Sequence, residues 1–300
     1  MFDSSQFDSI PKITSVNSSL FGSSKVKVSI LRLDELHPQL SGNKWFKLKY
    51  NLEQASKQHC KTLVSFGGAW SNHLHALAWA GKEFGFNTVA YVRGELIEPL
   101  NPCLQDASDW GMELRALSRE DYKRKDDPAF LNNLIRDVHS PYVIPEGGGN
   151  SLGIQGCSDI LEGIEQGKFD CISLACGTGT TMAGILTAAQ VPILGIQVLK
   201  GDGYLSNEVV AYLQTLSINP TVSWQVRDEF HRGGYARTDQ TLLDFCQYFE
   251  DETSVPLEPV YSGKMFMALA ELIKSEYFQK GAHILAVHGG GLQGNRGFFK

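Results

Sequence analysis

The chain has 300 residues, of which 42% are hydrophobic and 20% are charged, and its formal net charge is -6. This length and composition suit a globular protein with one large domain or two smaller ones. The acidic balance, without a long run of basic residues, argues against a dedicated nucleic-acid surface and against a binder of anionic membranes. We therefore expect a small-molecule role.

The N-terminal segment, MFDSSQFDSIPKITSV, has neither the basic n-region nor the apolar h-region of a secretory signal. No apolar run approaches the length of a membrane span. The six cysteines form no C-x-x-C pair and have no histidine at metal spacing, which favours free thiols and predicts no metal site. Together these features favour a cytoplasmic protein.

Along the chain, short apolar runs alternate with helical patterns. In residues 25–33, apolar side chains recur at every second position, as in a strand. Residues 43–59 have apolar side chains at helical spacing. The predicted buried face of that helix is Trp45, Leu48, Leu52 and Ala55. Further apolar runs lie at 62–66, 88–92, 142–145, 171–175, 193–199 and 283–288. Apolar strands separated by helices indicate parallel sheets covered on both faces, which is the doubly wound α/β class.

Glycine-rich turns follow four of these apolar runs. They are GGAWSN at 67–72, EGGGN at 146–150, GTGTT at 177–181 and GGG at 289–291. In open α/β sheets, ligands bind outside the carboxyl ends of the strands. We therefore expect the four turns to line one cleft, although any of them alone is compatible with a plain tight turn.

The stretch CISLACGTGTTMAGIL carries the most chemical information. Backbone N–H groups of a glycine-rich turn, a helix N-terminus and threonine hydroxyls suit a phosphate. The turn has no lysine at P-loop spacing, and Met182 stands where a dinucleotide fingerprint has its third glycine. A phosphorylated cofactor other than a nucleotide is therefore favoured. The alternative is a strand-to-helix turn with threonine caps and no ligand.

SGNKWFKLKY, at 41–50, places Lys44, Lys47 and Lys49 within six positions. Lysines at helical spacing commonly keep a surface solvated. A phosphate turn together with a lysine in an apolar setting nevertheless points to pyridoxal phosphate (PLP). That cofactor needs a Schiff-base lysine, a group facing its ring nitrogen, a group against its ring face and a phosphate turn.

Four segments resemble motifs of the 1-aminocyclopropane-1-carboxylate (ACC) deaminase and D-cysteine desulfhydrase family. SGNKWFKLKYNL is similar to GGNKxRKLxY, LVSFGGAWSNHLHALA to VSxGGxQSNHxRxxA, GTGTTMAG to the phosphate loop, and EPVYSGKMFMAL to DPVYxGKxMxGL. The resemblance implies fold type II, the tryptophan synthase β-subunit-like PLP fold. In that fold two doubly wound three-layer α/β/α domains hold the cofactor between them. A smaller α/β domain, 48–150, would be inserted in a larger one formed by 1–47 and 151–300.

The resemblance also implies roles for single residues. Lys44 would carry the cofactor, and Lys44, Ser71 and Tyr261 would be the catalytic groups, any of which could remove the α-proton. The implied cofactor-binding residues are Lys44, Asn72, Thr178, Gly179, Thr180, Thr181, Tyr261 and Ser262. The implied substrate-binding residues are Ser71, Asn72, His73 and Tyr235. The burial of Lys44 between apolar neighbours would lower its pKa and favour the neutral amine.

Two departures from the family pattern bear on the substrate. Ser262 stands where ACC deaminases of the family have a glutamate beside the ring nitrogen, so the ring should be a weaker electron sink. A weaker sink favours expulsion of a thiol over opening of a cyclopropane. Trp70 and His75 replace a glutamine and an arginine of the family motif, and Trp70 would narrow or reshape the substrate side of the cleft.

We therefore predict a PLP-dependent lyase or deaminase. Its most favoured reaction is β-elimination of D-cysteine, or a related β-substituted amino acid, to pyruvate and ammonia, with release of sulfide. ACC deamination to 2-oxobutanoate, another fold type II lyase or racemase, and a non-catalytic binder of a phosphorylated small molecule stay open. The predicted partner is a small amino acid, without nucleic acid or membrane, and family members form homodimers or larger homo-oligomers.

Overall fold

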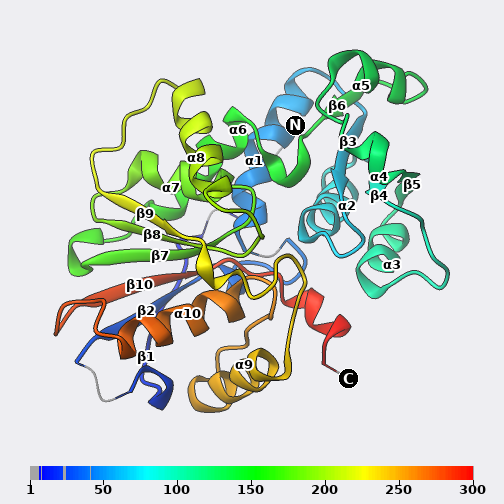
Figure 1. Ribbon diagram of the computed structural model, residues 1–300. Helices are drawn as coiled ribbons and strands as arrows, with labels where there is room; N and C mark the ends of the chain where they lie inside the picture. The colour runs from blue at the N-terminus through cyan, green and yellow to red at the C-terminus, as the bar shows by residue number, and fades with distance from the viewer. Residues whose placement is uncertain (1–6, 8, 23–24, 41, 300) are drawn as a thin grey trace.

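The computed structural model describes residues 7, 9–22, 25–40 and 42–299, and it contains two separate β-sheets (Figure 1). The larger sheet has the order β1 (Ile13–Val16), β2 (Lys27–Arg32), β10 (His283–His288), β7 (Cys171–Cys176), β8 (Ile193–Gln197) and β9 (Trp224–Arg227). The smaller sheet has the order β5 (Met112–Leu117), β4 (Asn87–Arg93), β3 (Thr62–Gly67) and β6 (Pro141–Val143). All described strand pairs are parallel except β1 with β2.

Helices cover both faces of the larger sheet. One face is covered by α9 (Gln240–Thr253) and α10 (Ser262–Lys274), and the other by α1 (Asn43–Lys57), α6 (Ser151–Ser158), α7 (Thr180–Ala188) and α8 (Tyr204–Thr215). Successive side chains of a strand point to opposite faces. In β2, Ile30 accordingly packs in the cluster with α9 and α10, whereas Leu31 packs in the cluster with α1. Both are fully buried, so the sheet is the middle of three layers.

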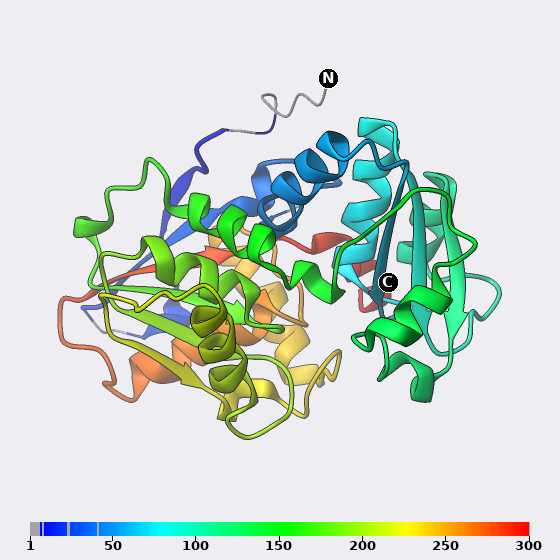
Figure 2. The same cartoon turned by 90° about the horizontal axis from the view of Figure 1, so that it is seen from above.

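The smaller sheet is also a middle layer. It has α2 (Asn72–Phe84) and α3 (Pro102–Asp109) on one face and α4 (Arg119–Tyr122) and α5 (Pro128–Leu134) on the other. In β3, Leu63 packs toward α2 and its neighbour Val64 packs in the opposite cluster. Figure 2 shows the two sheets side by side, with the larger one on the left. The predicted fold class, two three-layer α/β/α units, is confirmed.

Most predicted elements are present with bounds shifted by a few residues. The helix expected at 43–59 is α1, and each of its predicted buried residues is at most 1% exposed. The apolar runs correspond to the central strands β2, β3, β4, β7, β8 and β10 and to the short strand β6. Three strands were not predicted: β1, β5 and β9. Each lies at an edge of its sheet, where a single neighbour and partial burial leave only a weak apolar pattern.

The chain enters and leaves the smaller sheet through α1 and the turn after β6. The four strands of that sheet come from 62–143, whereas the larger sheet takes strands from both sides of this segment. The predicted boundary at residue 47 falls inside the continuous helix α1. The division into 1–47 with 151–300 and 48–150 stays a prediction.

Short 3-10 helices join several elements: η2 (Ser19–Phe21), η3 (Leu33–Glu35), η4 (Glu146–Gly148), η5 (Asp159–Leu161), η6 (Gln166–Lys168), η7 (Glu229–His231) and η8 (Leu292–Gly297). Among the described residues, no helix has both the length and the apolar character needed to cross a bilayer. All six cysteines are free thiols.

Candidate functional site

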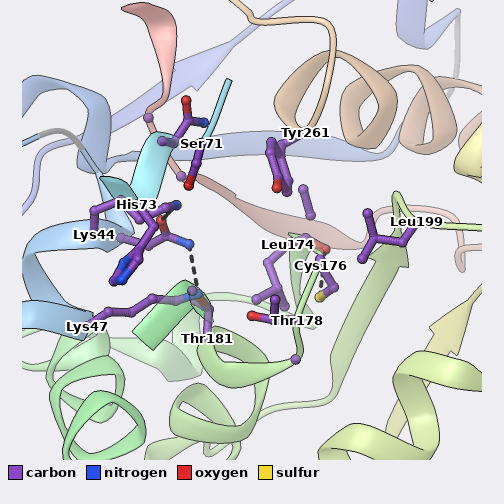
Figure 3. A pocket seen from close by; sticks show the side chains of 18 of the residues that line it. Lys44, Lys47, Ser71, His73, Leu174, Cys176, Thr178, Thr181, Leu199 and Tyr261 are labelled. Carbon is purple, nitrogen blue, oxygen red and sulfur yellow. Dashed lines mark hydrogen bonds between the residues drawn. The ribbon is translucent and has the colours of Figure 1, made fainter. Parts of the chain in front are cut away.

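A cavity lies between the two sheets, at the carboxyl ends of their strands (Figure 3). Its volume is about 180 Å³. By the same measure a single water needs about 10 to 15 Å³, so the space can hold a small organic molecule. Residues of all four glycine-rich turns line it: Gly68, Gly147, Gly177, Gly179, Gly289 and Gly290. The prediction that these turns share one cleft is confirmed.

Lys44 faces this cavity because the start of α1 lies against the last glycine-rich turn. Gly42 has a φ of 67°, and a Cβ on it would lie 1.9 Å from the carbonyl oxygen of Gly289, so only glycine fits. The backbone N–H of Asn43 donates to the same oxygen at 3.2 Å. One residue later, the Nζ of Lys44 donates to Asn43 Oδ1 at 2.5 Å and lies 5.9 Å from the centre of the Tyr261 ring.

The environment of Lys44 favours its neutral form. Burial lowers the pKa of Lys44 to about 7, and the positive charge of Lys47 acts in the same direction. An ordinary lysine is almost fully protonated at neutral pH, whereas this amine is neutral in a substantial fraction of molecules. A neutral amine is what a covalent attachment to a carbonyl group requires.

Lys47 is a second lysine at the cavity, one helical turn after Lys44. Its side chain is only 5% exposed, and among the described residues it has no carboxylate within 4 Å. Burial lowers its pKa. The nearby thiols of Cys157 and Cys176 supply no counter-charge, because burial raises their pKa values to about 11 and about 12. A buried cation without a counter-ion is costly, and a bound anion would offset that cost.

The turn from β7 into α7 faces the same side of the cavity as Lys47. Figure 3 shows Lys47, Thr178 and Thr181 on one side, and Ser71 and Tyr261 on the other. Thr181 Oγ1 accepts a hydrogen bond from Asn43 Nδ2 at 2.9 Å, which ties the turn to the start of α1. Hydroxyls, a helix N-terminus and an unpaired lysine make this corner fit a phosphate group.

Three of the four predicted phosphate-binding residues line the cavity. These are Thr178, Gly179 and Thr181. Thr180 is fully buried and lies behind them, with its hydroxyl 3.2 Å from that of Thr178. Thr180 is the first residue of α7, and it is not among the residues that line the cavity.

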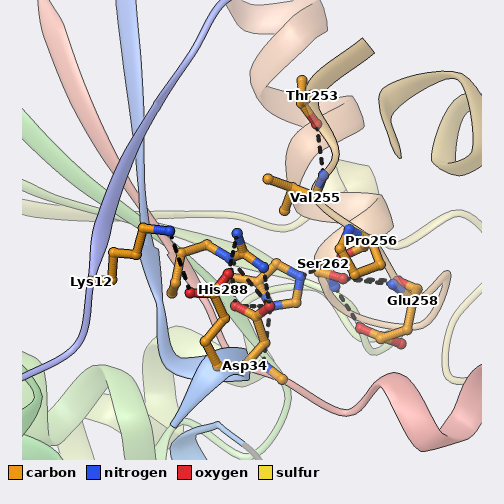
Figure 4. Close-up of polar contacts among 11 residues, drawn as sticks. Lys12, Asp34, Thr253, Val255, Pro256, Glu258, Ser262 and His288 are labelled. Carbon is orange, nitrogen blue, oxygen red and sulfur yellow. Dashed lines mark hydrogen bonds and ion pairs between the residues drawn. The ribbon is translucent and has the colours of Figure 1, made fainter. Parts of the chain in front are cut away.

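Tyr261 and Ser262 line the opposite wall at the start of α10. The carboxylate of Glu258 accepts the backbone N–H groups of Val260, Tyr261 and Ser262 at 2.8, 2.7 and 2.6 Å (Figure 4). Ser262 Oγ accepts from the backbone N–H of Glu258 at 2.9 Å and donates to its carbonyl oxygen at 3.1 Å. The serine hydroxyl must therefore rotate away from its own turn before it can donate to a ligand.

Glu258 is a buried carboxylate that sequence reasoning did not single out. Burial raises its pKa to about 7 and outweighs the three N–H bonds, which act in the opposite direction. The nearby His288 contacts two segments of the chain. Its Nε2 lies 2.8 Å from the carbonyl oxygen of Pro256, and its Nδ1 lies 3.4 Å from Asp34 (Figure 4). His288 immediately precedes the last glycine-rich turn, so this network holds that turn against the 256–262 segment.

The smaller sheet supplies Ser71, Asn72 and His73 to the cavity. Ser71 is the N-cap of α2, since its Oγ accepts the backbone N–H of Leu74 at 3.2 Å. Asn72 Oδ1 accepts from Gln293 Nε2 of the C-terminal segment at 2.8 Å. The predicted turn thus faces the cavity while also capping its helix.

His73 lines the cavity but is held by the protein. Its Nε2 lies 2.9 Å from Ser65 Oγ, and the side chain is buried. Burial lowers its pKa to about 3, and the charges of Lys47 and Lys44 act in the same direction. The imidazole is therefore neutral at physiological pH.

Tyr235 reaches the cavity from the loop after β9. Its hydroxyl donates to the carbonyl oxygen of Trp70 at 3.2 Å, and its ring lies 6.4 Å from that of Tyr261. The loop is anchored by the buried Lys264, whose Nζ donates to the carbonyl oxygens of His231 and Gly234 at 2.9 and 2.6 Å. Lys264 was missed in the sequence, although it stands two residues after Ser262.

His75 does not line the cavity. Its Nε2 lies 2.9 Å from Asp106 Oδ2 on α3, and Asp106 also pairs with Arg296. His75, which departs from the family motif, therefore joins α2 to α3 and does not form part of the cavity wall. Among the described residues, no cluster of three or more His, Cys, Asp or Glu side chains is placed to hold a metal ion.

The chain is similar to known proteins over most of its length. It matches the family described as "Pyridoxal-phosphate dependent enzyme" over residues 14–290. It is 32% identical over 289 residues to the Arabidopsis thaliana protein named bifunctional D-cysteine desulfhydrase/1-aminocyclopropane-1-carboxylate deaminase, mitochondrial, covering 88% of this chain and 72% of that protein. It is 25% identical over 281 residues to D-cysteine desulfhydrase of Salmonella typhi, covering 87% and 86%. A crystal structure described as an ACC deaminase homologue superposes with a TM-score of 0.84 at 25% identity, covering 97% and 92%.

Proposed function

The chain belongs to the pyridoxal-phosphate dependent enzyme family, as its four motifs predicted, and we propose that it eliminates the β-substituent of a small amino acid. D-Cysteine is the first candidate substrate. The overall reaction takes cysteine and water to hydrogen sulfide, pyruvate and ammonium. The observation that carries the proposal is that two lysines line the same cavity. Lys44 has a lowered pKa, and Lys47 has no counter-charge among the described residues.

The residues present fit the cofactor. Lys44 would hold PLP covalently, and Thr178, Gly179, Thr181 and Lys47 would hold its phosphate. Tyr261 would lie against the ring, and Ser262 is the polar group available to the ring nitrogen. When bound, PLP supplies a carbonyl group that condenses with amines and a ring that withdraws electrons from the α-carbon.

The lowered pKa of Lys44 supports it as the base for the α-proton. Its pKa of about 7 leaves much of the amine unprotonated near neutral pH. Tyr261 is the poorer base, because burial raises its pKa well above the ordinary value and keeps the hydroxyl protonated. A protonated Tyr261 could instead donate its proton to the departing thiolate.

The substrate carboxylate would bind at the turn that begins α2. Ser71 and Asn72 face the cavity there, and the N-terminus of this 13-residue helix favours an anion. After the α-proton and the thiolate have left, 2-aminoacrylate reacts with water to give pyruvate and ammonium. The walls formed by Tyr235 and Tyr261 would limit other access of water during this step.

ACC deamination is the second candidate, because the Arabidopsis relative is named for both activities. Ser262 argues against it on chemical grounds. Its hydroxyl is engaged with the backbone of Glu258 and carries no charge that could keep the ring nitrogen protonated.

One set of assays tests the proposal. Release of pyruvate, sulfide, ammonium and 2-oxobutanoate should be measured with D- and L-cysteine, D- and L-serine and ACC. We expect sulfide and pyruvate in equal amounts from one enantiomer of cysteine. Reaction of ACC alone would overturn the argument from Ser262, and reaction of none of these compounds would overturn the proposed function.

We further propose a cytoplasmic homodimer or larger homo-oligomer. The family resemblance supports the assembly, and the free thiols support a reducing compartment as the location. Light scattering of the purified protein and fractionation of cells test the two statements separately.

A further inference from the structure

A second pocket adjoins the candidate site on the side of the smaller sheet. We call it the basic side pocket and define it by Trp70, Arg93, Arg119, Tyr122, Lys123 and Tyr235. It shares Gly68, Arg93 and Tyr235 with the main cavity, so the two pockets adjoin. Of its residues, only Tyr235 has a role implied by the family resemblance, and Arg93, Arg119 and Lys123 have none.

The parallel sheet explains why three cations meet there. Arg93 is the last residue of β4, Arg119 is the first residue of α4 just after β5, and Lys123 follows α4. The neighbouring strand β3 ends at the turn that carries Gly68 and Ser71. Since parallel strands end at the same edge of a sheet, this topology places the cations beside the turn proposed to bind the substrate carboxylate.

The three cations lack counter-charges. No acidic residue lines the basic side pocket, and none of the three has a carboxylate within 4 Å among the described residues. The nearby acids have other partners, since Asp121 lies 3.6 Å from Arg124 and Glu146 lies 3.6 Å from Lys125. Three unpaired positive charges around one space repel each other, and they attract an anion even though the whole chain carries a net charge of -6.

Arg93 lies between the basic side pocket and the glycine-rich turn at 67–72. Its Nη2 would lie 3.5 Å from a Cβ placed on Gly68, and its guanidinium group lies 5.5 Å from the centre of the Tyr122 ring. Gly68 in turn accepts the backbone N–H of Ser71 at 3.0 Å. The guanidinium group therefore lies over the buried Tyr122, beside the turn that faces the substrate.

We propose that the basic side pocket binds an anionic group at the end of the substrate side chain. This inference rests on the proposed function and names its substrate class: amino acids whose β-substituent ends in a carboxylate, sulfonate or phosphate group. Arg93, Arg119 and Lys123 hold the anion, and the rings of Trp70 and Tyr235 flank the chain that leads to it. Trp70, absent from the family motif, thus lines the wall of this pocket.

The test uses two substrates that differ only in charge. S-(2-Carboxyethyl)cysteine ends in a carboxylate, and S-(2-carbamoylethyl)cysteine is its neutral amide of nearly equal size. In both, the α-proton is removed, the bond between Cβ and sulfur breaks, and the thiolate leaves with the electron pair and takes up a proton. Water then converts 2-aminoacrylate to pyruvate and ammonium. We expect kcat/KM to be at least about 10-fold higher for the acid, because its charged hydrogen bonds are the stronger ones.

Variants locate the effect. Arg93→Gln, and the double variant Arg119→Gln with Lys123→Gln, should each lower the acid-to-amide ratio of kcat/KM about 10-fold or more. Arg136→Gln removes one exposed positive charge of the same segment outside the pocket and should keep the wild-type ratio. If Arg93→Gln lowers kcat/KM equally for acid and amide, Arg93 binds the α-carboxylate and the inference is wrong.

A binding measurement separates this inference from the proposed function. 2-Aminopimelate and its ω-amide have the same lengths as the two substrates but no leaving group, so calorimetric titration of the holoenzyme reports affinity without turnover. Tighter binding of the acid by at least about 10-fold supports the basic side pocket, even if no substrate is eliminated. Acid and amide binding equally, or neither binding, overturns the inference, while sulfide release from cysteine would still support the proposed function.

Discussion

The wall from the larger sheet and the basic side pocket differ in how strongly the protein holds their side chains. On the wall from the larger sheet, Ser262 is buried and bonded to the backbone of Glu258, which lies behind it. In the basic side pocket, Arg93 is exposed and has no carboxylate partner among the described residues. Buried, bonded groups suit a cofactor that stays in place, whereas exposed cations suit a ligand that enters and leaves. We therefore propose that the wall from the larger sheet determines the chemistry and that the basic side pocket determines the substrate.

The largest expected effect lies on the cofactor side. Lys44→Ala should remove the visible absorbance of the attached cofactor and lower turnover by about a thousand-fold or more, because the covalent anchor and the proposed base are lost together. Lys49→Ala is the matched control, since Lys49 is on the same helix and pairs with Asp159 at 2.5 Å. An unchanged spectrum of Lys44→Ala would place the cofactor elsewhere.

Two buried groups of this wall should give opposite pH dependences in the cofactor-free protein. The pKa of Glu258 is raised from 4.5 to about 7, so between these values the folded protein binds more protons than the unfolded chain, and the free energy of unfolding falls as pH rises. The pKa of Lys44 is lowered from 10.5 to about 7, so the unfolded chain binds more protons above pH 7 and the free energy of unfolding rises again.

Urea unfolding from pH 5 to pH 9 measures both slopes. Because His73 and Lys264 also have lowered pKa values, the measured slopes are sums over several groups. Glu258→Gln should make the slope below pH 7 more positive and Lys44→Met should make the rise above pH 7 smaller, each changing the free energy of unfolding by a few kcal/mol at most. Glu271→Gln changes an exposed carboxylate of α10 and should keep the wild-type profile. If Glu258→Gln keeps the wild-type slope below pH 7, this carboxylate does not titrate in that range.

Lys47→Met should have opposite effects on the free protein and on cofactor binding. Removal of a buried charge without a counter-ion should raise the unfolding free energy of the cofactor-free protein by about 1 kcal/mol. The same change should weaken PLP binding about 10- to 100-fold, because a charged bond to the phosphate is lost. Titration of absorbance with PLP and urea unfolding measure the two effects. Unchanged PLP affinity would show that Lys47 does not face the phosphate.

The smallest expected effect lies on the substrate side. Ser71→Ala removes the N-cap of α2 and should lower the unfolding free energy by about 1 kcal/mol while raising the KM of the amino acid. Ser71→Asp keeps a good N-cap but places a negative charge beside the substrate carboxylate. It should therefore restore stability, measured by urea unfolding, without restoring KM. If Ser71→Asp restored both the free energy of unfolding and KM, Ser71 would act only as the N-cap of α2.

Local sequence patterns were sufficient to predict a helix or strand where buried residues recur at regular spacing along it. The apolar face of α1, from Trp45 to Ala55, could be read from helical spacing, and the central strands from their apolar runs. The edge strands β1, β5 and β9 could not, because partial burial weakens the alternation on which strand prediction depends. The glycine-rich turns were recognisable because each follows a buried strand.

Burial and contacts between elements could not be predicted from the sequence. Glu258 stands at the acidic position of the EPVY motif, but only the structure shows the burial that raises its pKa against the opposing effect of the backbone N–H groups of 260–262. Thr180 looked equivalent to Thr178 and Thr181, and only the structure shows that it is fully buried and does not line the cavity. His75 replaces a family arginine, yet its partner Asp106 comes from the next helix.

The sequence by itself determined the strand and helix order, the glycine-rich turns and the motifs of a PLP-dependent enzyme, because these depend on residue type and on spacing within short segments. Only the tertiary structure decided that Lys47 lacks a counter-charge and that Arg93, Arg119 and Lys123 surround one pocket. The reason is physical. The electrostatic energy of a charge depends on every neighbour within several ångströms, and in a parallel sheet those neighbours come from strands that are separated in the chain.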